Sequence, residues 1–115
     1  MWSRPSPSVR CRAPDAAAMI VAALRFELHI PDSESLKAKR AVVRPLVEGI
    51  RKRASVSVSE VDHHDTWQRC AIGVAMVSPD SASMETLIER VRRYVDDNME
   101  VDVLGCSVTY LEVEE

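Results

Sequence analysis

MIVAALRFELHI, residues 19–30, is the stretch that decides the fold, because apolar and polar positions alternate along it. Every even-numbered position from Ile20 to Ile30 is apolar, whereas the odd-numbered positions include Arg25, Glu27 and His29. A period of two places successive side chains on opposite faces of an extended strand. The stretch therefore predicts a half-buried strand with its even-numbered side chains toward a core.

The composition around this strand is that of one folded domain. The chain has 115 residues, of which 46% are hydrophobic and 29% charged, enough for a single core. Its longest apolar run, residues 16–24, is too short to cross a bilayer. Three cysteines without a CxxC pair suit neither a disulfide framework nor a structural zinc site. We therefore expect reduced thiols, a cytoplasmic location and no membrane partner.

The first 18 residues differ from the remainder of the chain. They carry Pro5, Pro7 and Pro14 among serines and arginines, without helical or strand periodicity. This composition predicts a disordered N-terminal extension over 1–18, preceding a domain over 19–115. Whether the working protein begins at Met1 or at Met19 stays open.

After the first strand, residues 35–53 combine an apolar stripe with many cations. Ser35 can cap a helix through its side-chain oxygen. Apolar residues then recur at spacings of three, four and seven: Leu36, Val43, Leu46, Val47 and Ile50. Pro45 lacks an amide proton, so we expect one helix with a kink or bend there.

The second half of the chain repeats the alternation of strand and helix. Residues 54–62 and 67–78 predict two strands joined by a hairpin at 63–66. Ser78 is the expected cap of a second helix, with Pro79 at its first position and an end near Asn98. A last strand over 101–113 would carry a bulge at Gly105, where the alternation loses phase.

This order of elements predicts a fold of the α+β class. Right-handed crossovers leave room for a strand between the two that each crossover connects. The natural solution is a ferredoxin-like βαββαβ sandwich, with a four-stranded antiparallel sheet and both helices on one face. The first and third strands should be its central pair, with the odd-numbered positions of 21–29 and 67–77 on the uncovered face.

Two sequence blocks resemble a known family. Residues 35–40, SLKAKR, fit a SLKxKR block, and residues 67–69 read WQR. On these blocks the chain resembles the YlxP-like bacterial family of unknown function. The resemblance implies the ferredoxin-like fold and genes near those of translation initiation and ribosome maturation. The leader and the His63-His64 pair depart from the family pattern, so neither receives a family role.

Cations and one tryptophan are the candidate RNA contacts. Antiparallel pairing of the central strands would place Arg25, His29, Trp67 and Arg69 at one end of the open sheet face. The cations of the basic helix are a separate candidate surface. The candidate residues are Arg25, His29, Lys37, Lys39, Arg40, Arg44, Trp67 and Arg69. The alternatives are that Trp67 only covers the sheet end, that Arg69 pairs with Glu27, and that the helix cations form a solvated surface.

Small apolar residues at the other end of the same face are candidate contacts for a homodimer. They are Val21, Ala23, Gly73, Ala75 and Val77. A second copy packed sheet to sheet would cover them. Alternatively, the C-terminal strand or the leader covers this patch.

Catalytic motifs are not found in the sequence. It has no GxxxxGK[ST] or GxGxxG, and no base is spaced to activate Cys70 or Cys106. The His63-His64-Asp65 run has no third ligand at a suitable spacing for a metal. We therefore expect a non-catalytic module without metal or cofactor. Its expected partners are RNA or a ribosomal particle, not DNA, and a second copy; a small-molecule pocket at a dimer interface is a weaker alternative.

Overall fold

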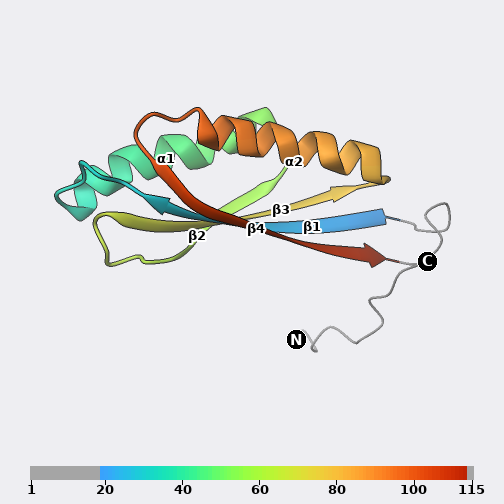
Figure 1. Ribbon diagram of the computed structural model, residues 1–115, viewed down its shortest axis with the longest axis horizontal. Helices are drawn as coiled ribbons and strands as arrows, with labels where there is room; N and C mark the ends of the chain where they lie inside the picture. The colour runs from blue at the N-terminus through green and yellow to red at the C-terminus, as the bar shows by residue number, and fades with distance from the viewer. Residues whose placement is uncertain (1–18, 114–115) are drawn as a thin grey trace.

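Strands and helices follow one another in the predicted order, as Figure 1 shows. The structure is a computed structural model that describes residues 19–113, so the predicted extension over 1–18 lies outside the described residues. The elements are β1 (Met19–His29), α1 (Leu36–Arg53), β2 (Ser57–Asp62), β3 (Arg69–Ser78), α2 (Ser81–Asp96) and β4 (Asp102–Val113).

The four strands form one antiparallel sheet in the order β2-β3-β1-β4. Both helices lie along the same face of this sheet (Figure 1), which confirms the ferredoxin-like α+β fold. In the central pair Arg25 lies opposite Gly73, and Val21 lies opposite Val77. The even-numbered residues of β1 from Ile20 to Leu28 are at most 8% exposed, so the predicted parity is confirmed for β1.

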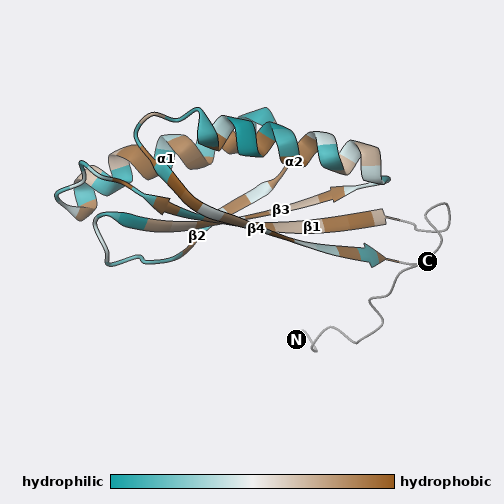
Figure 2. Ribbon diagram, in the orientation of Figure 1, coloured by the Kyte–Doolittle hydropathy of each residue, from teal (hydrophilic) through white to brown (hydrophobic). Residues whose placement is uncertain are grey.

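The core lies between the sheet and the two helices. Figure 2 shows hydrophobic colour along the strands and polar colour on much of the outer helix surface. Phe26, Ile72 and Leu46 are among the residues that are at most 1% exposed. Burial of each such side chain stabilises the fold by about 1.5–3 kcal/mol.

The two helices begin at different kinds of cap. Ser35 caps α1 as predicted, and its Oγ accepts a hydrogen bond of 3.0 Å from the backbone N–H of Ala38. α1 continues through Pro45 as one helix. At α2 the predicted cap Ser78 is wrong: Asp80 is the cap, and its Oδ1 accepts from the Ser83 N–H at 2.7 Å. Ser78 instead ends β3, which leaves Pro79 before the cap rather than inside the helix.

Two strand boundaries and the bulge also differ from the prediction. β2 begins at Ser57, because Ala54 still belongs to the end of α1, and β3 begins at Arg69. Trp67 therefore lies in the hairpin. In β4 the register shifts between Val103 and Gly105, so the extra residue is Leu104, next to the predicted Gly105. No helix of the described part combines the length and apolarity needed to span a membrane.

Candidate functional site

The open sheet face carries an ion network centred on Glu27. Its Oε2 accepts from Arg25 Nε at 2.9 Å, and its Oε1 accepts from Arg69 Nη2 and from His63 Nε2, each at 3.1 Å. Arg25 also bonds Asp62 at 3.2 Å. The antiparallel register produces this cluster, because Glu27 on β1 lies diagonal to Arg69 on β3.

These contacts act on the protonation of Glu27. Partial burial works to raise the pKa of its carboxyl, but the hydrogen bonds from Arg25, His63 and Arg69 outweigh it and hold the pKa below its ordinary value. A carboxylate therefore sits at the middle of the candidate RNA platform. The Arg69–Glu27 ion pair, which we gave as the alternative to RNA contact, is present in the structure.

Trp67 lies in the hairpin, outside the paired strands of the sheet. It is 52% exposed and precedes β3. The charges of Arg25 and Arg69 are matched by those of Glu27 and Asp62. His29 is close to Asp102, with 3.4 Å between Nδ1 and Oδ2. The sheet face thus offers little net positive charge for phosphates.

Lys39 is buried, in contrast with the exposed position that we expected. Its side chain is 4% exposed and its Nζ lies 2.8 Å from Glu60 Oε2. The same Nζ donates to the backbone carbonyl of His63 at 2.6 Å. His63 has a positive φ of 64°, which directs its carbonyl toward α1 while its ring reaches Glu27 on the open face. Lys39 is therefore a structural residue of the α1–hairpin junction and cannot present its charge to phosphates.

Cys70 lies close to this buried pair. Desolvation by burial, followed by the charge of Glu60, raises the pKa of its thiol to about 12. A thiol with that pKa stays protonated at neutral pH and is not a nucleophile. No group of three or more potential metal ligands occurs within residues 19–113.

The two family blocks meet at the hairpin. Gln68 Nε2 donates to the carbonyl of Ser33 at 3.2 Å, and the Ile30 N–H donates to the Gln68 carbonyl at 2.9 Å. Ser35 caps α1 directly after this turn. Ser35, Lys39 and Gln68 of these two blocks thus position the hairpin against the start of α1. The roles of Gln68, Glu60 and His63 depend on long-range contacts, so the sequence analysis missed them.

Lys37, Arg40 and Arg44 are the candidate cations that remain exposed on α1. No acidic partner for them occurs among the described residues. A cavity of about 210 Å³ lies between α1, β2 and the hairpin, and its lining includes Arg40, Arg44 and His64. In Figure 1 the hairpin and the first turns of α1 lie at the same end of the molecule.

The predicted dimer patch is smaller than expected. Val21 with Val77 and Ala23 with Ala75 are directly opposite pairs, and Val77 is 57% exposed. Gly73 does not belong to it, because Val61 of β2 lies above it: a Cβ on Gly73 would be 2.9 Å from Val61 Cγ1. β4 pairs beside β1 and does not fold over the patch.

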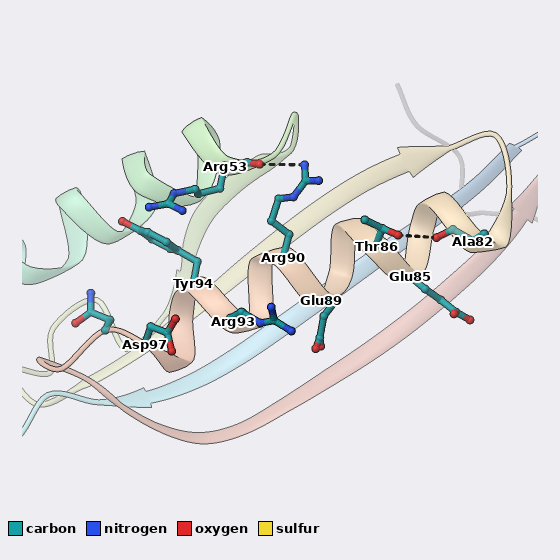
Figure 3. Close-up of a pocket in the computed structure, with 10 residues that line it drawn as sticks. Arg53, Ala82, Glu85, Thr86, Glu89, Arg90, Arg93, Tyr94 and Asp97 are labelled. Atoms are coloured by element: carbon teal, nitrogen blue, oxygen red, sulfur yellow. Dashed lines mark hydrogen bonds between the residues drawn. The ribbon is translucent and has the colours of Figure 1, made fainter.

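A second concave region lies beside α2 and was not predicted. Figure 3 shows Arg53, Arg90 and Tyr94 between the two helices, with Glu85 and Glu89 directed away from α1. The groove measures about 800 Å³. The Arg53 guanidinium lies 5.0 Å from the centroid of the Tyr94 ring. Because both acidic and basic residues line the groove, its charge favours neither an anionic nor a cationic ligand.

The fold and site define a small α+β protein of ferredoxin-like topology with a neutralised sheet face and a basic first helix. Residues 21–108 match the family model described as "Protein of unknown function (DUF503)". The uncharacterized protein YlxP of Bacillus subtilis (strain 168) is 37% identical over 76 residues, which cover 66% of this chain and 83% of that protein. The chain therefore belongs to this family of unknown function, which confirms the resemblance.

Two solved structures are also similar. The de novo designed protein Foldit4 has a TM-score of 0.49 and 15% identity, over 84% of this chain and 99% of that one. A C-terminal segment of the alpha subunit of aIF2 from Pyrococcus abyssi has a TM-score of 0.38 and 17% identity, over 84% of this chain and 52% of that one.

Proposed function

We propose that this protein is a non-catalytic RNA-associated module that contacts phosphates through the exposed face of α1. The observation that carries the proposal is the set of three cations, Lys37, Arg40 and Arg44, without an acidic partner among residues 19–113. Cations on a protein surface bind phosphates with an affinity that falls as salt rises. The resemblance to a family with translation-related gene neighbours favours RNA as the source of those phosphates.

The spacing of these cations suits a nucleic-acid backbone. Positions three and four apart lie on one side of a helix, and seven residues span about 10 Å along its axis. Trp67 and His64 come from the hairpin that Lys39 fastens to α1. Trp67 supplies one face on which an unpaired base can stack. Arg25 and Arg69, which are held by Glu27, are left out of the proposed contact surface.

Binding of a fluorescent single-stranded RNA at several salt concentrations tests the proposal. With three phosphate contacts, the logarithm of the association constant should fall with a slope of about −2 against log salt. Arg40→Ala and Arg44→Ala should each weaken binding and reduce that slope by about 0.7. Trp67→Ala should weaken binding with the slope unchanged, because stacking releases no counterions.

Arg93→Ala is the matched control, since it removes an exposed guanidinium from α2 instead of α1. It should bind RNA as the unchanged protein does. Affinity that is equal for the unchanged protein, Arg40→Ala and Arg44→Ala would refute the proposed surface. Equally tight binding to duplex DNA would show a general polyanion surface and contradict the assignment to RNA.

A further inference from the structure

β4 has a free edge whose central part lacks the usual protection against pairing. Within the described residues β4 is bonded to β1 alone and forms one edge of the sheet. It is 12 residues long, and positions 103–111 contain neither a charge nor a proline. The other edge, β2, is 6 residues long, carries Glu60 and Asp62 and is bulged. Natural edge strands avoid further pairing by such charges and bulges. β2 has them within its six residues, whereas in β4 the bulge at Leu104 and the acids Asp102 and Glu112 lie toward the ends and leave residues 105–111 without them.

The helix-side surface of β4 is also incompletely covered. Val103, Cys106 and Val108 are only partly buried, and Tyr110 is 53% exposed, although they lie on the same side as the core. Their neighbour Leu24 on β1 is 1% exposed. The two helices therefore cover β1 but leave β4 extending beyond them, so this strand presents both a free edge and an apolar strip.

We infer that a second copy of this chain pairs with β4, antiparallel to it, about a two-fold axis at Val108. This inference goes beyond the proposed RNA contact and uses a different surface. A peptide added as one strand would satisfy the edge but leave the apolar strip uncovered. A two-fold axis perpendicular to the sheet keeps both pairs of helices on the same face. The apolar strips of the two β4 strands would therefore lie side by side on that face and cover each other.

The axis position follows from the bulge and the acids. Beyond Leu104 the regular part of the uncharged strand is residues 105–111, and its centre is Val108. An axis there places each Ser107 opposite Thr109 of the second copy, and each Cys106 opposite Tyr110. Gly105 has open space beside it, which admits a neighbouring strand.

Analytical ultracentrifugation of the full chain over a range of concentrations tests this dimer. Tyr110→Lys places a charge on the strip and should raise the dimer dissociation constant at least about tenfold. The matched control is Ala75→Arg, another exposed position on the opposite sheet face, which should leave the constant unchanged. A monomer at about 100 µM, or dissociation by Ala75→Arg with no effect of Tyr110→Lys, would overturn the edge dimer; the latter would favour face-to-face packing.

A cross-linking experiment tests the axis itself. In a background with Cys11→Ser and Cys106→Ser, Val108→Cys would bring two thiols together at Cα separations of about 4.5–5.5 Å. Added oxidised glutathione should then give a disulfide-linked dimer, as it accepts the two electrons and two protons. Thr109→Cys in the same background should cross-link at least about tenfold more slowly, because its copies lie farther apart. Equal rates for both variants would contradict an axis at Val108.

Discussion

Among single residues, Lys39 fixes the position of the hairpin against α1. Its ammonium group is removed from water and contacts two protein acceptors instead, the Glu60 carboxylate and the His63 carbonyl. Replacement by Met would leave the Glu60 carboxylate, whose side chain is 25% exposed, without its cation. We expect Lys39→Met to lower the free energy of unfolding by about 2–4 kcal/mol, less than for a fully enclosed pair. Urea denaturation monitored by circular dichroism measures this change.

The double variant Lys39→Met, Glu60→Leu is the companion measurement. Replacing both charges by apolar groups of similar size removes the uncompensated carboxylate, so most of the lost stability should return. Lys37→Met provides the control for loss of one lysine, since Lys37 is exposed on the same helix. Equal stability of Lys39→Met and Lys37→Met would show that the buried pair is not a stabilising contact.

The sequence places Lys39 near the apolar stripe of α1 but does not indicate its partners. Lys39 is four residues before Val43 and seven before Leu46, so it lies on the apolar stripe of α1. Arg40 has the same kind of spacing, four residues after Leu36 and three before Val43, but is exposed, so spacing alone does not separate it from Lys39. The bond to the His63 carbonyl joins residues 24 apart and depends on a positive φ. No local pattern predicts such a geometry.

At the scale of elements, the packing of α1 on α2 depends on Gly49. A Cβ at this position would overlap the phenol of Tyr94, whose ring lies across α1 beneath Arg53. Gly49→Ala gains about 1 kcal/mol of helix propensity but forces the ring to move, which costs about 1–3 kcal/mol. We therefore expect a net loss of about 1 kcal/mol in the free energy of unfolding.

A double-mutant cycle separates these two effects on α1. In a Tyr94→Ala background the overlap is gone, so Gly49→Ala should stabilise the protein by about 0.5–1 kcal/mol. The sign of the alanine effect should thus reverse between the two backgrounds, as measured by thermal or urea unfolding. Stabilisation by Gly49→Ala in the presence of Tyr94 would show that the ring does not need the glycine.

Element boundaries were predictable where local chemistry alone sets them. Alternation in 19–30 fixed which face of β1 is buried, and Ser35 was identified as a cap from its place before the apolar stripe. Ser78 failed as a cap because it is buried at the end of β3, while Asp80 offers a carboxylate to the first turn of α2. The ion network around Glu27 could not be predicted in full without the strand register, because it joins residues of β1, β3 and the hairpin. This network neutralises the cations that we had assigned to RNA contact on the sheet face.

At the scale of the whole molecule, the two proposed surfaces do not compete. α1 packs over β2 and carries the cations, whereas β4 is the opposite edge of the sheet. Pairing of two β4 strands would leave both α1 helices at the outer ends of one eight-stranded sheet, on the same side. A dimer of this geometry would present two cationic helices to one RNA, so binding to a long RNA would gain from both sites.

Stability in acid is the remaining property of the whole molecule that the ion network should control. Glu27 and Asp62 have pKa values below their ordinary values of 4.5 and 3.8; at Asp62 the cause is first the His63 backbone N–H and then Arg25. A depressed pKa in the folded state stabilises the protein above the ordinary value, and this stabilisation is lost as the pH falls through the folded pKa. The free energy of unfolding should therefore decrease below about pH 4.5.

Glu27→Gln should make that decrease less steep, because the folded state of the variant has no carboxylate to protonate at this position. Arg69→Ala should instead shift the loss to higher pH, since removal of one donor lets the pKa of Glu27 rise. Urea unfolding at a series of pH values from neutral to acid measures both effects, and NMR titration of the Glu27 carboxyl measures the pKa directly. If the curves of Glu27→Gln and the unchanged protein stay parallel throughout, the bonds from Arg25, His63 and Arg69 do not lower the pKa of Glu27 in the folded state.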